Sequence, residues 1–492
     1  MSIEEENGVF PRDDELLKIL YQQNPWWQDK PIPDIKLKEF KRRDFFKLLQ
    51  SLDDNKVLTI IGARQVGKTT MLYQLIEKLR GEIDPKKIFF LSLDDPYLFI
   101  NQKNFARIFD LYSANIIKKP LGELDDTIYF IFDEIQVLKN WQDILKRWID
   151  LGYKIKFIIS GSSSTDIVGG TSESLVGRIK IQIVLPLKFL EYVRFKEKSK
   201  FDDLLHITNK KMREGLKLAI QSQNPENFYD SLVKSAAELA PIKDNLTAYL
   251  NEYLIQGGYP EIVTLDDNYK KAEIISKYLE LTIYKDIVKT EKIRDPASLE
   301  SLFAILAKES SQIMNRQRIS KSLGINRDTL NTYLYLLKGS FLISDAEVYT
   351  KSAVTRGKSE KKMYVNDIGI RNVIAGVFDD HILSDHTEVG KMIETVVADH
   401  TKRLKFNLEP SSKPSLFYWR SSHEVDIIID LYQKPLPIEV KFRETIEESY
   451  LKGLRSFIEK FNCKLSIVVT KNYLARNDSI VFVPAWLFLI LC

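Results

Sequence analysis

The segment GARQVGKTT at 62–70 has the spacing G-x-x-x-x-G-K-[ST], which suits the binding of phosphate groups. It follows the apolar run VLTII and begins the helical pattern TTMLYQLIEKL, so a strand, a loop and a helix are expected in that order. Its two glycines allow the loop to turn N–H groups toward phosphates, and the helix N-terminus adds partial positive charge. Lys68 is expected to reach the outer phosphates and Thr69 to bind Mg2+. The predicted ATP-binding loop consists of Gly62, Ala63, Arg64, Gln65, Val66, Gly67, Lys68, Thr69 and Thr70.

A second segment, IYFIFDEIQ at 128–136, is an apolar run that ends in two carboxylates. A central strand delivers such groups to the carboxyl edge of a parallel sheet. There Asp133 would bind Mg2+ through water, and Glu134 would polarise the attacking water. The alternative is an ordinary acidic loop. The strand KIFFLSL lies between this segment and the phosphate loop along the chain, an order that favours an ATPase over a small-molecule kinase.

Two further positions are candidates for contact with phosphates. The strand FIISGSSS at 157–164 ends in hydroxyl side chains, of which Ser160 and Ser162 are the candidates for the terminal phosphate or the water. Arg178 precedes the last strand, where a guanidinium could reach a phosphate of its own or of a neighbouring subunit. An ordinary surface arginine is the equal alternative. We select Ser160 as a nucleotide contact and Arg178 as a catalytic residue.

These motifs resemble those of a large group of archaeal and bacterial AAA-type ATPases of the extended family. The chain carries GARQVGKT, DEIQ, SGSSS, LVGR followed by IVLPLKFLEY, and GGYP at 257–260. The resemblance covers nearly the whole chain from about residue 40, and it implies an oligomeric ATPase with a winged-helix module and a C-terminal domain of uncharacterised function. Two departures are Ser160, where the family usually has Thr, and the lack of a recognisable second sensor Arg in the helical zone.

Carboxylates and a lysine gather in two apolar segments near the C-terminus, HEVDIIID at 423–430 and LPIEVKF at 436–442. The side-chain period of a strand sends Glu439 and Lys441 to the same face, where they would flank a metal-bound water. The spacing resembles the D-x(n)-E-x-K core of restriction-endonuclease-like nucleases. Asp426 and Glu439 would then bind Mg2+ or Mn2+, and Lys441 would orient or deprotonate the nucleophile.

One helical residue extends this resemblance. Glu394, in the pattern GKMIETVVADH, matches the position from which that superfamily often supplies an extra carboxylate to the metal. The alternative is that Glu439 and Lys441 are ordinary charged residues at a solvated strand edge, because E-x-K is a common triplet. Since folds outlast their chemistry, a catalytically silent C-terminal domain also stays open.

The segment RQRISKSLGINRDTLNTYLYLLKGSFLIS at 316–344 predicts a helix, a turn at Gly324, a second helix and a strand. Residues 311–362 carry ten Lys or Arg against four Asp or Glu in a chain whose net charge is only +4, so we expect a basic, exposed wing that suits DNA phosphates. The alternative is a protein-packing module. The predicted recognition helix starts with the polar residues Asn326, Arg327, Thr329 and Asn331.

The fold that must position these residues is α/β. Short apolar runs alternate with helical patterns from 56 to 186, which predicts the parallel sheet of a P-loop NTPase. The pattern is almost entirely helical from about 200 to 350, and strands mix with helices from about 385. The expected parts are an N-terminal extension (1–45), an AAA-type domain (46–200), a helical lid (201–300), a winged-helix module (301–365) and a restriction-endonuclease-like α/β domain (385–492).

Composition excludes several other classes of protein. A chain of 492 residues with 44% apolar and 28% charged residues is globular and too long for one core. Two cysteines exclude a disulfide framework, and the acidic N-terminus lacks the features of a signal peptide. The terminal run IVFVPAWLFLILC is broken by Pro484 and is shorter than the roughly 20 residues of a membrane span. We expect a cytoplasmic protein with no membrane partner and a buried strand and helix at the C-terminus.

Together these patterns favour an oligomeric, DNA-associated ATPase coupled to a metal-dependent nuclease-like domain. One rival is a nucleotide-controlled switch whose C-terminal domain binds a partner and cuts nothing. Another is a DNA-binding ATPase whose nuclease-like fold only grips the duplex.

Overall fold

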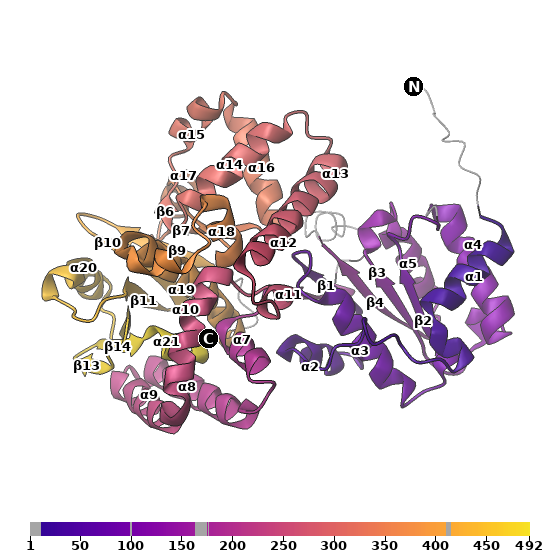
Figure 1. The fold of residues 1–492 in the computed structure, drawn as a ribbon, viewed down its shortest axis with the longest axis horizontal. Helices are drawn as coiled ribbons and strands as arrows, with labels where there is room; N and C mark the ends of the chain where they lie inside the picture. Colours follow the sequence, from indigo (N-terminus) through magenta and orange to yellow (C-terminus); the bar gives the residue numbers. More distant parts are fainter. Residues whose placement is uncertain (1–10, 99–100, 163–174, 176, 410–414) are drawn as a thin grey trace. The chain divides into compact units, whose positions relative to one another are not determined.

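The chain divides after Leu185 into two units, Met1–Leu185 and Pro186–Cys492. The computed structural model describes residues 11–98, 101–162, 175, 177–409 and 415–492. Each unit is built around a sheet of its own, as Figure 1 shows.

The sheet of the first unit is parallel. Its strands in the described residues are β1 (Val57–Gly62), β2 (Ile88–Ser92), β3 (Ile128–Asp133), β4 (Ile155–Gly161) and β5 (Ile179–Val184). They pair in the order β2-β3-β4-β1-β5. The first four are almost entirely buried, as expected for parallel strands that are apolar on both faces. The predicted parallel sheet is confirmed, and within the sheet β4 lies between β1 and β3.

Helices surround this sheet, and the N-terminal extension closes its edge. Asn24 donates from Nδ2 to the carbonyl of Phe90 at 2.9 Å and accepts the N–H of the same residue at 2.7 Å. The indole N–H groups of Trp26 and Trp27 both donate to the carbonyl of Ile88 at 2.9 Å. Side chains of the extension thus pair with backbone groups at the edge of β2, where no neighbouring strand pairs with them. The helices are α1 (Asp13–Gln23), α2 (Arg43–Leu49), α3 (Lys68–Arg80), α4 (Gln102–Tyr112) and α5 (Trp141–Asp150).

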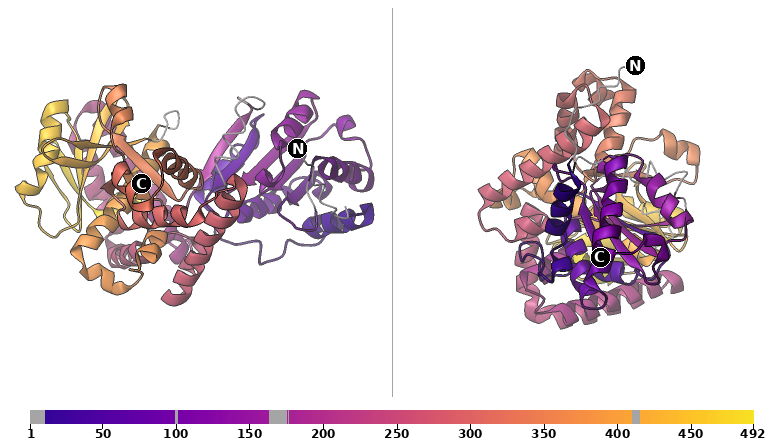
Figure 2. Two further views of the ribbon diagram at one scale, coloured as in Figure 1. Left: turned by 90° about the horizontal axis from the view of Figure 1, so that it is seen from above. Right: turned by 90° about the vertical axis from the view of Figure 1, so that its right-hand side faces the viewer.

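The second unit begins with helices. The long helices α8 and α9 lie side by side as a hairpin (Figures 1 and 2). Two residues connect them, of which Asn224 caps α9 by accepting the N–H of Glu226. This stretch comprises α7 (Phe189–Lys196), α8 (Asp202–Ser222), α9 (Pro225–Leu239), α10 (Lys243–Gln256), α11 (Pro260–Val263), α12 (Asn268–Glu280), a π-helix (Leu281–Val288) and α13 (Lys289–Glu291).

The helix-turn-helix plan predicted around residue 324 is present. Gly324 adopts a left-handed conformation at φ 66°, and α16 begins at Arg327. Asn326 caps α16, because its side-chain oxygen accepts the N–H of Thr329 at 2.8 Å. The elements are α14 (Pro296–Lys308), β6 (Gln312–Ile313), α15 (Arg316–Leu323), α16 (Arg327–Gly339), β7 (Ile343–Val348), α17 (Ala353–Lys358) and β8 (Lys362–Val365).

Strands from both the helix-turn-helix segment and the C-terminal segment join in one mixed sheet. In the described part of this unit the order is β13-β14-β12-β11-β10-β9-β7-β8-β6. The link is the parallel pairing of β7 with β9. The C-terminal elements are α18 (Ile368–Ala375), α19 (His386–Leu408), β9 (Leu416–Arg420), β10 (Glu424–Leu431), β11 (Lys434–Lys441), α20 (Lys452–Phe461), β12 (Ser466–Thr470), β13 (Ala475–Asn477), β14 (Ile480–Pro484) and α21 (Ala485–Leu491).

Two short motifs of the sequence form one structural joint in this unit. The N–H of Leu187, in the LPL segment, donates to the carbonyl of Gly258 in GGYP at 2.7 Å. The N–H of Gly258 in turn donates to the Asp367 carboxylate at 2.9 Å. Burial raises the pKa of Asp367 to about 6. These motifs therefore join the end of α10 and the start of α18 to the segment before α7.

The apolar C-terminal run is a buried strand and helix. β14 and α21 are buried throughout, which confirms the prediction for residues 480–492. Among the described residues, no helix has both the length and the apolar character needed to cross a membrane.

Candidate active site

The phosphate loop lies at the carboxyl edge of the first sheet, between β1 and α3. A Cβ on Gly62 would lie 1.8 Å from the carbonyl oxygen of Val184, so only glycine lets β5 pair this closely. Gly67 has φ 93°, a left-handed conformation that favours glycine. Gln65, at φ 59°, adds a second left-handed turn. The backbone therefore has the curled form that the sequence predicts.

Lys68, the first residue of α3, is buried in this loop. Its ammonium donates to the carbonyls of Gly62 at 3.0 Å and Ala63 at 2.9 Å. These contacts direct the side chain back over the loop, where the outer phosphates of a nucleotide are expected.

Thr69 and Asp133 meet beside the loop. Thr69 Oγ1 donates to Asp133 Oδ2 at 2.6 Å, and Asp133 is only 3% exposed. Burial, with a contribution from the neighbouring charge of Glu134, raises the pKa of Asp133 to about 6. A hydroxyl and a carboxylate are the hard oxygen donors that Mg2+ prefers, so this pair fits the expected ion.

Glu134 follows β3 in a left-handed backbone conformation, with φ 54°. Gln136 donates from Nε2 to the Glu134 carboxylate and, at 3.2 Å, to Ser162 Oγ. Its Oε1 is buried and has no hydrogen-bond partner among the described residues. A non-glycine residue in the left-handed conformation of Glu134 is strained, and such strain is common at functional sites. The backbone and Gln136 together fix the direction of the Glu134 side chain.

Ser160 and Ser162 lie at the end of β4 in different roles. Ser160 Oγ donates to Asp133 Oδ1 and accepts the N–H of Glu134 at 3.3 Å. Ser162 contacts Gln136 instead. Ser160 thus supports the pair of acidic residues directly, while its contact with a nucleotide stays a prediction.

Arg178 lies at the opposite edge of the sheet. Its carbonyl accepts the N–H of Val57, the first residue of β1, and its guanidinium pairs with Asp150. The phosphate loop follows the other end of β1, roughly 20 Å away for a strand of six residues. Arg178 therefore does not reach the phosphate loop of its own subunit. Contact with a neighbouring subunit stays a prediction.

Two residues that contact the site were not predicted from the sequence. Arg42, buried at 4% exposure, donates from Nη1 to the carbonyl of Val66 in the phosphate loop at 2.9 Å. Gln136 is the other. Gln136 stands within DEIQ and could have been selected by its place beside Glu134, but nothing in the basic run around Arg42 indicates a contact 24 residues away.

A second candidate site joins β10 and β11. Their antiparallel register pairs Ile427 with Ile438, which places Asp426 beside Glu439. Asp426 Oδ2 accepts the N–H of Val440 at 2.9 Å. Lys441 donates from Nζ to Glu439 Oε1 at 2.5 Å and lies 3.9 Å from Asp426 Oδ2. The structure therefore brings together the three residues predicted from D-x(n)-E-x-K.

Glu394, from α19, is linked to the same cluster by Lys362, a residue that was not predicted from the sequence. Lys362, from β8, is 2% exposed, and its Nζ lies 2.7 Å from Glu394 Oε1 and 2.7 Å from Glu424 Oε1. It also lies 3.8 Å from Asp426 Oδ1. Burial raises the pKa of Glu394 to about 7 and, with the charge of Asp426, that of Glu439 to about 8. Buried carboxylates and lysines thus interleave in this cluster.

The oxygen donors of this cluster are of the type that Mg2+ and Mn2+ accept. In the part of the chain that is described, no three His, Cys, Asp or Glu side chains are arranged together as a metal site. Ammonium groups lie between the carboxylates instead. The metal-binding role of Asp426, Glu439 and Glu394 stays a prediction.

The basic helix-turn-helix segment exposes less positive charge than its sequence suggests. Lys338 and Lys361 pair with Asp345, Arg318 pairs with an adjacent carboxylate, and Lys362 is buried. The expected basic wing stays a prediction, and ion pairs with Asp345 and Glu309 neutralise part of its charge. The basic side chains exposed in this segment are Arg318, Lys321, Arg327, Lys351 and Lys358.

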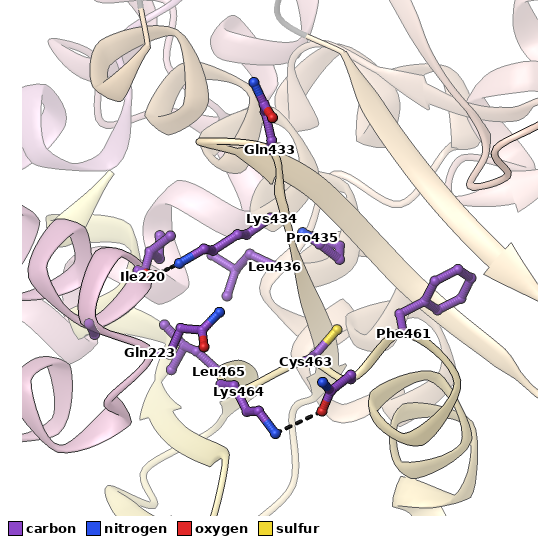
Figure 3. A pocket seen from close by; sticks show the side chains of 12 residues that line it. Ile220, Gln223, Gln433, Lys434, Pro435, Leu436, Phe461, Cys463, Lys464 and Leu465 are labelled. Atoms are coloured by element: carbon purple, nitrogen blue, oxygen red, sulfur yellow. Dashed lines mark hydrogen bonds between the residues drawn. The ribbon is translucent and has the colours of Figure 1, made fainter.

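A pocket of about 280 Å³ lies between the end of α8, the β10–β11 turn and the loop before β12 (Figure 3). Lys434 reaches from the turn to the carbonyl of Ile220 at 3.0 Å. Burial raises the pKa of Cys463 in its wall to about 12, so this thiol is no nucleophile at neutral pH. None of the predicted site residues lines this pocket.

Three segments of the chain match known protein families. Residues 54–193 match a family described as an AAA domain. This segment is an AAA-family ATPase domain. It contains the phosphate loop, Asp133, Glu134 and Ser160. Two families described only as domains of unknown function match residues 247–381 and 389–488.

Two relatives match this chain over most of their own length. The chain is 28% identical to an uncharacterised protein of Methanocaldococcus jannaschii over 84% of this chain and 82% of that protein. It is 23% identical to an uncharacterised protein of Haemophilus influenzae over 90% and 96% of the two chains. Among solved structures, a Walker-type ATPase of Pyrococcus abyssi is similar with a TM-score of 0.41 and 15% identity, covering 71% of this chain and 99% of that one.

Proposed function

We propose that this protein is an ATPase whose AAA domain hydrolyses ATP with Mg2+ and controls a DNA-associated, nuclease-like C-terminal segment. The observation that supports hydrolysis best is the hydrogen bond of 2.6 Å between Thr69 and Asp133, with Glu134 next in the chain. It joins the phosphate loop to the acidic end of β3 in one site.

Each residue has a role in this proposal. Lys68 binds the outer phosphates, and Thr69 and Asp133 bind Mg2+. A bound Mg2+ would orient the phosphates and neutralise charge that develops on them. Glu134, directed by Gln136, polarises the attacking water, and Ser160 supports Asp133 from the next strand.

Replacement of Glu134 by Gln tests this site. The variant should bind ATP with wild-type affinity, because Lys68 and the loop are intact, and release phosphate at least about 100-fold more slowly, because the base is removed. The matched control is Glu82→Gln, at an exposed position of the same unit. Hydrolysis by Glu134→Gln at the wild-type rate would refute the assignment.

For the C-terminal cluster we propose metal-dependent cleavage of DNA. Asp426 and Glu439 would bind one Mg2+ or Mn2+, Glu394 would add a carboxylate, and Lys441 would orient or deprotonate the nucleophile. The antiparallel register that sets Asp426 beside Glu439 supports this arrangement.

A cleavage assay on single-stranded, duplex and branched DNA with Mn2+ tests this role. Lys441→Ala should abolish cleavage, while Lys452→Ala, an exposed lysine of α20, should leave it unchanged. If the wild type cuts none of these substrates, the nuclease proposal fails. The nucleotide-controlled switch with a silent C-terminal domain would then replace it.

A further inference from the structure

The two oxygens of Asp426 face different ammonium groups. Oδ2 accepts the N–H of Val440 and lies 3.9 Å from Lys441, on the side of Glu439. Oδ1 lies 3.8 Å from Lys362, on the side of Glu394. The cluster therefore has two halves, each with a lysine between carboxylates.

Lys362 is fixed in its half by the sheet. In β8 it pairs with Ile313 of β6 on one side and Ala346 of β7 on the other. Its ammonium lies 2.7 Å from each of two carboxylates and is almost completely buried. Burial acts to lower the pKa of Lys362, but the charges of Glu394, Asp426 and Glu424 raise it well above its ordinary value. A charged group that is buried must be paired, and here the carboxylates pair it.

We propose that the ammonium of Lys362 occupies the position of a divalent cation between Glu394 and Asp426, so that the cluster binds one divalent ion fewer than its carboxylates alone would bind. This inference rests on the proposed metal-dependent role of the same cluster. The remaining ion would bind in the other half, at Asp426 and Glu439.

The charges of the cluster agree with a single ion. Fully ionised, Glu394, Glu424, Asp426 and Glu439 carry four negative charges, and Lys362 and Lys441 carry two positive ones. One divalent cation would balance the remaining two. A second would leave two excess positive charges in a buried site, which is unfavourable, whereas loss of the Lys362 charge would halve that excess.

The arrangement makes Lys362 a positioning residue contributed by the helix-turn-helix segment. It acts on the nuclease-like half through Asp426 and Glu394. Since β8 belongs to the same sheet as β10 and β11, the segment that we propose to bind DNA also determines how many ions the cluster accepts.

Counting bound Mn2+ tests the inference directly. Free Mn2+ is measured by electron paramagnetic resonance during titration of the full-length protein without nucleotide. Any Mn2+ bound at the AAA domain is then common to all variants and cancels when their numbers are compared. Lys362→Met should bind one more Mn2+ per chain than the wild type. Lys362→Arg, which retains the charge, and Lys361→Met, whose lysine pairs with Asp345 and Glu347 instead, should bind the wild-type number.

The count also separates this inference from the nuclease proposal. Equal Mn2+ numbers for Lys362→Met and the wild type would overturn the role of Lys362, even if the wild type cuts DNA. A wild type that cuts nothing would overturn the nuclease proposal and leave the count valid. If Lys362→Met does not fold, as judged by its circular dichroism melt, Lys362→Gln replaces it, because its neutral amide can still donate a hydrogen bond to one of the carboxylates left unpaired. The same extra ion is expected there, and its absence overturns the inference.

Discussion

At the scale of single residues, the direction of Glu134 depends on Gln136. The amide of Gln136 donates to the Glu134 carboxylate and to Ser162, and its own carbonyl is buried without a partner among the described residues. A catalytic carboxylate must point at the water within a narrow range of angles. We therefore expect Gln136 to be a positioning residue for hydrolysis.

Gln136→Ala should lower kcat for ATP hydrolysis about tenfold, which corresponds to about 1.4 kcal/mol, with KM for ATP unchanged within about twofold. The phosphate loop keeps its contacts, so binding is preserved. Steady-state kinetics measure both constants. Val137→Ala, at a 44% exposed neighbour, is the control. A variant with normal kcat, or with only KM raised, would contradict the positioning role.

His400 makes the stability of the second unit sensitive to acid. Its Nε2 accepts the N–H of Phe189 at 2.9 Å, and its Nδ1 faces the carbonyl of Val396 at 2.8 Å, so the ring is neutral. Burial is the main cause that lowers the pKa of His400 to about 4, against the opposing charge of Asp399 and with the charges of Arg403 and Lys188. The unfolded chain, with a pKa of about 6.5, binds the proton first as pH falls.

The contribution of His400 is thus complete above about pH 6.5 and disappears as pH falls toward 4. The pKa difference corresponds to about 3 kcal/mol. Urea denaturation at pH 7 and pH 4 should show a smaller decrease in stability for His400→Gln than for the wild type. His381→Gln, at an exposed histidine, should behave as the wild type. Parallel decreases in all three proteins would exclude this origin of acid sensitivity.

At the scale of elements, the N-terminal extension stabilises the edge of the first sheet. Asn24 is fully buried and pairs with both backbone groups of Phe90 in β2. Asn24→Ala leaves those groups unpaired and should lower the free energy of unfolding by about 2 kcal/mol. Thermal denaturation, with Gln28→Ala at an exposed position as control, measures the decrease. A melting temperature equal to that of the control would show that water pairs with the backbone groups of Phe90 when the Asn24 side chain is absent.

The helix-turn-helix segment should bind DNA through its exposed lysines and arginines. Lys321→Ala combined with Arg327→Ala should weaken binding of any sequence and reduce the slope of log K against log salt by about 1 for each DNA phosphate that the variant no longer neutralises. Fluorescence anisotropy at several salt concentrations measures both effects. Lys361→Ala, at a lysine already paired with Asp345 and Glu347, is the control. Equal weakening by the control would argue against this surface.

Local patterns in the sequence were sufficient to predict the parallel sheet, the phosphate loop, the acidic end of β3 and the turn at Gly324. Each depends on residues that are close in the chain. Lys362 could not be predicted, because its meeting with Glu394 and Asp426 depends on the pairing of β7 with β9. Ion pairs with Asp345 and Glu309 explain why the basic wing carries less free charge than expected. The place of Arg178 follows from the parallel pairing of β1 with β5, because a residue that precedes β5 lies at the edge of the sheet opposite to the phosphate loop.

At the scale of the whole molecule, the place of Arg178 leads us to infer an oligomer in which it acts on a neighbouring subunit. Arg178→Ala and Lys68→Ala should each be nearly inactive as ATPases. A mixture of the two should regain part of the activity, because a subunit with an intact phosphate loop can then receive Arg178 from its neighbour. Phosphate release by the mixture measures this. Failure of the mixture to regain activity, with both variants folded, would exclude this role for Arg178.

The central claim is that ATP hydrolysis at Lys68 and Glu134 is coupled to DNA bound by the second unit. The most direct measurement is the rate of phosphate release with and without single-stranded, duplex and branched DNA. We expect at least one DNA to raise the rate several-fold in the wild type. The Lys321→Ala/Arg327→Ala variant should keep the basal rate and lose the stimulation. If no DNA changes the rate of the wild type, the claim of coupling is contradicted.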